Sequence, residues 1–180
     1  MINEKGIMKM KRLLLLSLVL LMTLSLLTAC GGEKYRNDLT SAQVMESITA
    51  AIPSEEGYRQ VSDSYISASM WGENYAVLLE NSADYYIILS EKSDVNIDEV
   101  GVFHVKDSAK VEELKAIVET YVEGQTLRFR DLLASYNPDE LPKLDEATVE
   151  VRGNYIYYSI LSEDATVKAL AAFESALKAE

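Results

Sequence analysis

The spacing of apolar residues after Thr40 predicts a helix that begins near this residue. Three apolar residues recur at intervals of four and share one helical face: Val44, Ile48 and Ile52. Thr40 and Gln43 have the spacing of a capping box, in which each side chain bonds the backbone N–H of the other residue. The helix is expected to end at Pro53, because proline removes a backbone donor and clashes with the preceding turn.

The longest helical pattern runs from about Ser108 to Ser135. Its apolar stripe begins at Val111 and continues through Leu114, Val118, Tyr121, Val122, Gln125, Phe129, Leu132, Leu133 and Tyr136. We expect one continuous helix despite Gly124, ended by the Asn-Pro pair at 137–138. A last helix is predicted after Asp164, with an apolar stripe formed by Val167, Leu170, Phe173 and Leu177.

Four segments are predicted as strands. "DYYIILSEK" and "DEVGVFHVKD" are joined by the turn-rich "SEKSDVNID", and "TVEVRGNYIYYSI" is a hairpin with Gly153 and Asn154 as its two-residue turn. This register puts five residues on one face of the hairpin: Val149, Val151, Ile156, Tyr158 and Ile160. The other face carries Arg152, Tyr155 and Tyr157.

A weak internal repeat supports an α+β fold. "VKDSAKVEELKA" and "LSEDATVKALAA" align without a gap, and each follows two predicted strands. Two strand–strand–helix units predict a four-stranded antiparallel sheet with helices packed on one face, plus an N-terminal helix. Between Glu55 and Asn81 the pattern fits either a short capped helix from Ser62 or Asp63, or an irregular loop, with Trp71 packed somewhere.

Residues 1–29 have the organisation of an export signal. Lys9, Lys11 and Arg12 precede 17 residues, Leu13 to Ala29, that are apolar apart from small hydroxyl side chains. As a helix this stretch would rise about 26 Å, less than the roughly 30 Å hydrocarbon core of a bilayer. A charged start, an apolar centre and a small residue at the end favour a secretory signal over an uncleaved membrane anchor.

Cys30 is the only cysteine and directly follows the apolar segment. The sequence "LTAC" that ends at Cys30 resembles the lipobox of bacterial lipoproteins. The resemblance implies cleavage before Cys30 and attachment of a diacylglyceryl group to its sulfur, the atom that is nucleophilic enough near neutral pH. Two acyl chains anchor stably where one is marginal. We therefore expect a signal peptide (1–29), a lipidated tether (30–39) and one α+β domain (40–180), held on the extracytoplasmic face of the cell membrane.

Charge argues against nucleic acid as a partner. Residues 1–29 carry four basic side chains and one acidic side chain out of 17 and 29, so the mature chain keeps 13 basic and 28 acidic residues and a formal charge of −15. Such a surface repels phosphate backbones and anionic lipid headgroups. Cationic ligands remain compatible with it.

Five features of the sequence, with the spacing from the long helix onward, carry a resemblance to a known family: "VGVFHVKD", Gln125 with Phe129, Tyr136 with Pro138, "LDEATVEVRGNYIYYSI" and the closing "FESAL". The resemblance is to a family of bacterial lipoproteins, the domain-of-unknown-function family 4358. It extends from about Thr40 to the C-terminus. It implies an exported lipoprotein with an α+β domain, and it implies no activity, cofactor or catalytic residue.

Motifs for catalysis and metal binding are weak. His104 is the only histidine and alternates onto the face opposite Phe103, so a surface histidine is favoured over a general base. "DVNIDEVG" begins like a calcium loop, but Glu99 stands where glycine is needed and Val105 where glutamate is needed. No catalytic residue, cofactor or metal ligand is predicted. Gln125, polar on an apolar stripe, either lines a pocket between helix and sheet or bonds nearby backbone at the edge of the core.

Tyrosines are the candidate recognition residues. The chain has 11 tyrosines against three phenylalanines and one tryptophan. If the helices cover one side of the sheet, Tyr155 and Tyr157 form an open aromatic surface on the other side, with Arg152 and His104 beside them. The alternative is that the N-terminal helix covers this face.

The function expected from these features is binding rather than catalysis. The leading hypothesis is a non-enzymatic interaction module for an unknown protein or small ligand, anchored through Cys30. One alternative is a carboxylate-dependent cell-envelope hydrolase, which requires two acids in a cleft with at least one raised pKa. Another is an accessory lipoprotein of a transporter or wall-building complex.

Overall fold

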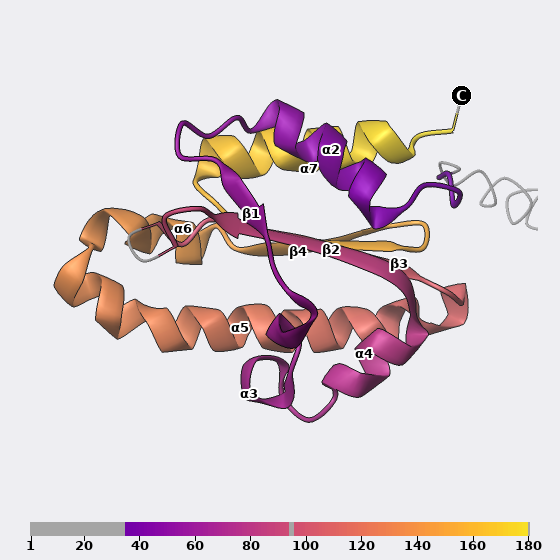
Figure 1. Ribbon diagram of the computed structural model, residues 1–180, viewed down its shortest axis with the longest axis horizontal. Helices are drawn as coiled ribbons and strands as arrows, with labels where there is room; N and C mark the ends of the chain where they lie inside the picture. Colours follow the sequence, from indigo (N-terminus) through magenta and orange to yellow (C-terminus); the bar gives the residue numbers. More distant parts are fainter. Residues whose placement is uncertain (1–34, 94–95, 180) are drawn as a thin grey trace, which may run out of the picture. The chain divides into compact units, whose positions relative to one another are not determined.

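Five antiparallel strands form one sheet in the order β1-β2-β3-β5-β4 (Figure 1). Their bounds are β1 Tyr58–Gln60, β2 Ser82–Ser90, β3 Glu99–Val105, β4 Thr148–Arg152 and β5 Tyr155–Ile160. This computed structural model describes residues 35–93 and 96–179. The predictions for the signal segment and for Cys30 lie outside the described residues. Within the described part of the chain, no helix is long and apolar enough to cross a membrane.

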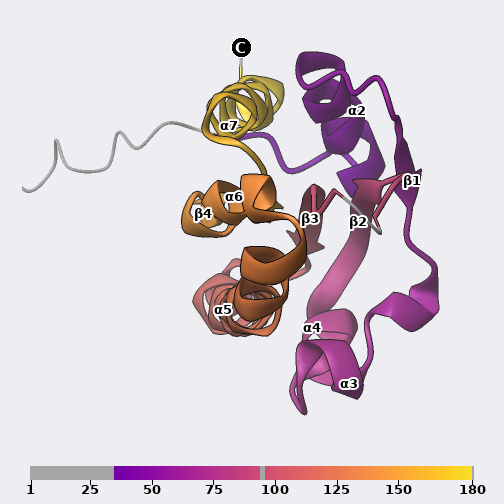
Figure 2. The same cartoon turned by 90° about the vertical axis from the view of Figure 1, so that its left-hand side faces the viewer.

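Helices pack against both faces of the sheet. One face carries α2 (Ser41–Ala51) and α7 (Glu163–Leu177), which lie side by side. The other carries α5 (Val111–Tyr136) together with the short helices α3 (Ala68–Trp71) and α4 (Tyr75–Asn81), as Figure 2 shows. The 3₁₀ turn η2 (Asp63–Tyr65) follows β1, and α6 (Leu141–Asp145) follows the end of α5.

Several local predictions are confirmed. The Thr40 side chain accepts from the backbone of Gln43, and the Gln43 side chain accepts from the backbone of Thr40, so the capping box starts α2. The long helix is continuous over 26 residues. Gly153 has φ +58°, as a two-residue hairpin turn requires at this position, and it joins β4 to β5.

All four predicted strands are present in one antiparallel sheet, and this sheet differs from the prediction in two respects. First, it has a fifth strand, because Tyr58–Gln60 pairs with Ile88–Ser90 along the edge of β2. Second, the helices do not lie on one face, because α5 and α7 follow their hairpins on opposite sides. Each strand–strand–helix unit is present. The apolar stripe of its helix shows that the helix packs on the sheet, but it does not specify which face of the sheet the helix covers.

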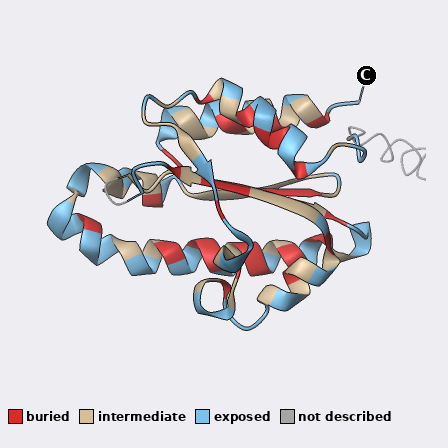
Figure 3. Cartoon of the chain, in the orientation of Figure 1, coloured by how far each residue is buried: buried red, intermediate tan, exposed pale blue. Residues whose placement is uncertain are grey.

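The tyrosine-bearing face is therefore covered, so the open surface is wrong and the alternative, in which the N-terminal helix packs over this face, is the one that the structure shows. Tyr155 and Tyr157 are both 0% exposed. Tyr157 stacks on Phe173 of α7, with ring centroids 5.1 Å apart, and α2 supplies further cover through Val44 and Ile48. Figure 3 shows buried residues on the sheet-facing sides of the helices in both layers. The alternation predicted for β5 is correct, since Ile156 and Tyr158 lie on the opposite face and pack under α5.

Two predicted apolar stripes are only partly buried. Leu132 and Tyr136 are exposed, because the last turns of α5 extend past the sheet towards α6 (Figure 1). In α7, Val167 is also exposed, and Ala169 is fully buried in its place.

Candidate functional site

A buried carboxylate lies at the start of β3, on the face of the sheet that α5 covers. Glu99 is 5% exposed. Its Oε1 accepts hydrogen bonds from Tyr158 (2.5 Å) and Tyr121 (2.7 Å), and its Oε2 accepts one from Tyr65 (3.1 Å). The three hydroxyls come from β5, α5 and η2. The carboxylate thus connects three elements that are far apart in sequence.

A glycine positions one of these tyrosines. Gly101 is paired with Tyr158 across β3 and β5, and the tyrosine ring lies over the glycine Cα. A Cβ on Gly101 would lie 2.0 Å from Cε1 of Tyr158. The absence of a side chain at this position therefore lets the ring lie along β3 and bring its hydroxyl to Glu99, two residues away.

Aromatic packing fixes the second tyrosine. The ring of Tyr121 is parallel to the indole of Trp71, with centroids 3.7 Å apart and 2° between the planes. The indole also contacts Phe103 and Tyr158 edge-on. Trp71, whose environment the sequence pattern left open, belongs to the core beneath the sheet.

Gln125 extends the hydrogen-bonded cluster by one helical turn. Its Nε2 donates to the hydroxyl of Tyr121 at 2.6 Å, and the residue is 3% exposed. Its Oε1 is buried and has no hydrogen-bond partner among the described residues. A buried acceptor without a partner costs free energy, so native structures rarely keep one without a reason.

Burial sets the electrostatics of this cluster. Desolvation raises the pKa of Glu99, and the bonds from Tyr158, Tyr121 and Tyr65 offset part of that rise. Burial, with the charge of Glu99 as a further cause, raises the pKa of each of the three tyrosines, so they stay neutral donors. No basic side chain in the described ranges forms an ion pair with Glu99.

A cavity of about 200 Å³ opens beside the cluster, between α5 and the sheet. We call it the Gln125 pocket. Its polar lining includes Tyr65, Glu99 and Gln125, and its apolar lining comes from Met70, Leu89, Ile97 and Phe129. Of the two alternatives for Gln125, the structure therefore shows the pocket-lining one. Arg128 lies at the rim, exposed, with its guanidinium over the ring of Phe129.

Two acids line this pocket, but their bonding favours binding over acid–base catalysis. Both oxygens of Glu99 accept tyrosine hydroxyls, and Asp98 forms an ion pair with Lys143 at 2.6 Å. Glu99 Oε2, which accepts a single bond, retains a lone pair for a further donor, whereas the other acid that an acid–base pair would need, Asp98, is held by Lys143. In the part of the chain that the structure describes, no group of three His, Cys, Asp or Glu residues could hold a metal ion.

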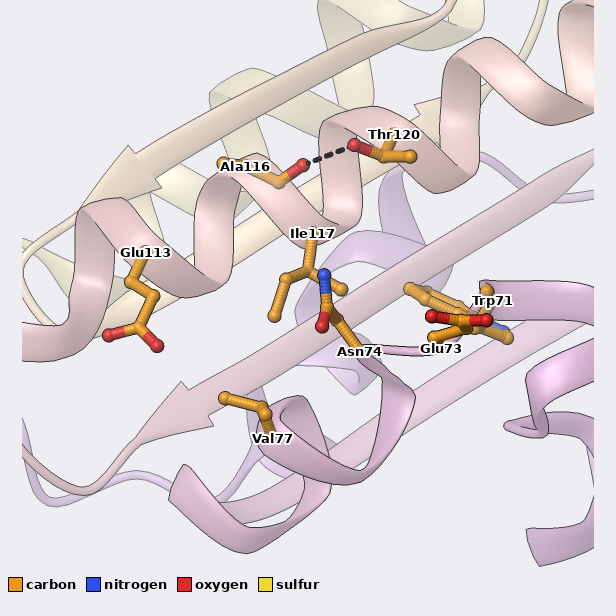
Figure 4. Close-up of a pocket in the computed structure, with 9 residues that line it drawn as sticks. Trp71, Glu73, Asn74, Val77, Glu113, Ala116, Ile117 and Thr120 are labelled. Atoms are coloured by element: carbon orange, nitrogen blue, oxygen red, sulfur yellow. Dashed lines mark hydrogen bonds between the residues drawn. The ribbon is translucent and has the colours of Figure 1, made fainter.

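A second cavity, of about 310 Å³, lies between the α3–α4 turn and α5 (Figure 4). Glu113, Ile117 and Thr120 line it from α5, and Trp71 and Val77 line it from the other side. The Thr120 hydroxyl is already bonded to the carbonyl of Ala116. Neither Glu99 nor Gln125 lines this cavity, so the Gln125 pocket is the stronger candidate.

Two of the residues predicted for partner binding, His104 and Tyr155, lie at the ends of β3 and β5 that are far from Glu99. The Tyr155 hydroxyl donates to the carbonyl of Leu39 (2.6 Å) and accepts from its N–H (3.1 Å). His104 stacks on Tyr155, with centroids 4.4 Å apart, and bonds the side chain of Asn37. These contacts fix the chain that enters α2 and leave no open surface.

Arg152 and Tyr157 do not extend that cluster into a binding surface. Arg152 forms ion pairs with Glu150 and Glu174. Tyr157 lies under α7. The four predicted residues are thus used within the fold, and partner binding through the two buried tyrosine rings would require α2 and α7 to move.

Sequence reasoning missed Glu99 and its three tyrosines. A signal for Glu99 was present, because strand alternation places it on the same face as Gly101 and Phe103, which is the buried face. Gln125 on the apolar stripe of α5, four residues after Tyr121, was the second signal.

The fold and pocket define an α+β protein in which a five-stranded antiparallel sheet lies between two helical layers. A scan against family models matches residues 66–161 to the domain of unknown function DUF4358. The chain belongs to this family, as the resemblance implied. The matched region contains Glu99, Gln125 and two tyrosines of the cluster, Tyr121 and Tyr158. Tyr65, α2 and α7 lie outside it. No curated protein matched the chain, and no solved structure matched it.

Proposed function

We propose that this protein is a lipid-anchored, extracytoplasmic binding protein without catalytic activity, and that the Gln125 pocket takes a small ligand. The observation that carries the proposal is the buried Oε1 of Gln125, which has no hydrogen-bond partner in the described ranges and belongs to a residue that lines a largely apolar cavity. Ligand sites in proteins typically combine an apolar cavity with a few placed polar groups.

The anchor rests on the sequence around Cys30, where the export segment and the lipobox-like "LTAC" meet the only cysteine. Two acyl chains on this sulfur would hold the domain at the outer face of the cell membrane. The mass of the intact protein from its own cell is expected to correspond to a chain that begins at a diacylglyceryl-modified Cys30. An unmodified thiol with residues 1–29 attached would contradict the anchor.

The pocket is tested with the full-length protein in a nonionic detergent. A panel of water-soluble fragments of roughly six to ten heavy atoms suits the cavity, since a space of about 150 Å³ already accommodates benzene. Ligand-observed NMR is expected to detect several binders. The substitution Gln125→Met keeps the volume and removes the amide, and it should abolish their binding.

Glu123→Gln is the matched control, because Glu123 is exposed on the same helix and does not line this pocket. Binding by this variant should equal that of the wild type. The proposal is overturned if no fragment binds, or if Gln125→Met binds every fragment as well as the control does.

A further inference from the structure

We infer that the Gln125 pocket selects ligands with a primary ammonium group on a short apolar body. This inference rests on the proposed function and names the chemical class of its ligand. Three features of the described residues carry it: the acceptors at the inner end of the pocket, the unbalanced charge of Glu99, and the apolar walls.

The inner end of the pocket presents acceptors. Among residues 35–93 and 96–179, Gln125 Oε1 has no partner, and Glu99 Oε2 accepts only the bond from Tyr65, whereas Oε1 of Glu99 accepts two. A carboxylate oxygen has the lone pairs for a second donor. Every hydroxyl proton of the three tyrosines is already directed within the cluster, so the oxygens left over there, Gln125 Oε1 and Glu99 Oε2, act as acceptors. A ligand with several N–H donors matches this arrangement.

When Glu99 is ionised, no described residue balances its charge, in agreement with the raised pKa of this carboxyl. Buried carboxylates are normally paired with a cation, because an isolated buried charge is costly. Three cations near the pocket have other partners. Lys143 pairs with Asp98 and Glu140, Arg128 contacts Met70 at the rim, and Arg59 donates to Ser93. An ammonium group would supply the missing positive charge and three donors in one atom.

The apolar walls of the pocket determine the size and polarity of the part of the ligand that carries the ammonium group. Leu89, Ile97 and Phe129 present apolar surface between the inner acceptors and the rim. The volume of about 200 Å³ suits a short alkyl or aryl body. The formal charge of −15 on the mature chain also attracts cations to the domain over long distances.

Three probes of equal length separate the charge from the apolar body: hexylammonium, 1-hexanol and hexanoate. Titration calorimetry of the full-length protein, at one detergent concentration, should show saturable binding of hexylammonium. Binding of 1-hexanol should be roughly tenfold weaker or more, and hexanoate should not bind, because it would meet the carboxylate of Glu99.

Two variants test the residues. Glu99→Gln keeps the size but removes the charge and replaces one accepting oxygen with an NH2 donor. It should weaken the binding of hexylammonium roughly 30-fold. Gln125→Met should also weaken it, which keeps the test decisive if Glu99→Gln does not fold. Glu73→Gln is the charge-matched control, because Glu73 is an exposed acid on the wall of the other cavity. It should leave the affinity unchanged.

Each contrary result has a separate meaning. Equal binding of 1-hexanol and hexylammonium, lost in Gln125→Met, overturns the ammonium class and leaves the pocket as a ligand site. Equal loss in Glu99→Gln and Glu73→Gln also overturns the inference, since it reveals a general effect of net charge. If none of the probes or fragments binds, both the inference and the proposed function are wrong.

Discussion

The ring of Tyr158 lies over Gly101, so closely that a Cβ on the glycine would stand 2.0 Å from Cε1. The two residues face each other in the register of β3 and β5. This contact between a ring and a glycine is what allows a tyrosine from β5 to reach the carboxylate of Glu99 on the neighbouring strand.

Gly101→Ala should therefore destabilise the protein by about 1–3 kcal/mol, the usual cost of overpacking a core. The change forces the Tyr158 ring away from Glu99. Urea denaturation followed by circular dichroism measures the free energy of unfolding. Gly124→Ala is the control, because a Cβ there meets nothing within 4 Å, and alanine in a helix interior should add up to about 1 kcal/mol of stability. Equal effects of the two substitutions would contradict the packing argument.

Glu99→Gln should change how stability depends on pH. Because burial raises the pKa of Glu99 above its ordinary value of 4.5, the folded state binds more protons than the unfolded state between the two pKa values. This carboxyl therefore favours folding most below about pH 4.5, and its contribution declines as pH rises. The wild type should lose stability relative to Glu99→Gln over this range, by about 1.4 kcal/mol for each unit of the shift.

The groups that face Glu99 stay neutral over the same range, since they are Tyr65, Tyr121, Tyr158 and Gln125. The nearest ion pair, between Lys143 and Asp98, is common to both proteins. Denaturation curves from pH 4 to pH 8 give the comparison. The measured quantity is the difference in the free energy of unfolding between the wild type and Glu99→Gln. If this difference stays constant with pH, or changes in the other direction, the hydrogen bonds from the three tyrosines outweigh desolvation in setting the pKa of Glu99.

Tyr155→Phe should loosen the segment before α2. The substitution removes both hydrogen bonds to Leu39 and leaves its carbonyl and N–H without that partner, at a cost of about 1–2 kcal/mol. Hydrogen exchange should become faster at the Leu39 amide. Tyr136→Phe, in which an exposed tyrosine changes, serves as the reference and should alter neither measurement. Unchanged exchange at Leu39 would argue that packing alone holds this segment.

Lys143→Met should destabilise the junction between α6 and the start of β3. The lysine side chain is 13% exposed and contacts Asp98 at 2.6 Å and Glu140 at 2.8 Å. Its loss leaves two partly buried carboxylates without a cation, which costs about 3–5 kcal/mol for a buried pair and less here because of the exposure. Lys168→Met provides the comparison, since its pair with Asp164 is exposed and should contribute under about 1 kcal/mol.

The parts of the fold that follow from local sequence were predictable. The capping box at Thr40, the hairpin turn at Gly153 and the alternation of Tyr157 with Tyr158 each depend on residues a few positions apart. The face that α7 covers was not predictable in this way. An apolar stripe shows that a helix is amphipathic, and only the competition for space on the sheet decides that it lies beside α2.

The candidate site depends more on contacts between residues far apart in sequence than these parts of the fold do. Glu99 meets Tyr65 at a separation of 34 residues and Tyr158 at a separation of 59. Strand alternation could place the carboxylate on the buried face. Which groups would satisfy it there depends on the three-dimensional packing of η2, α5 and β5, for which a single sequence holds no periodic signal.

The attachment of Leu39 to Tyr155 also has a mechanical consequence. Tyr35 forms a bridge with Lys178, and the Arg36 amide bonds the carbonyl of Leu177, so the first described residues are fastened both to β5 and to the end of α7. Tension applied to the N-terminal side must break these contacts before it can unwind α2. Force that reaches the domain through the residues before Tyr35 would act on the contacts at the Tyr155 end of the sheet. The Gln125 pocket, at the other end, would keep its shape.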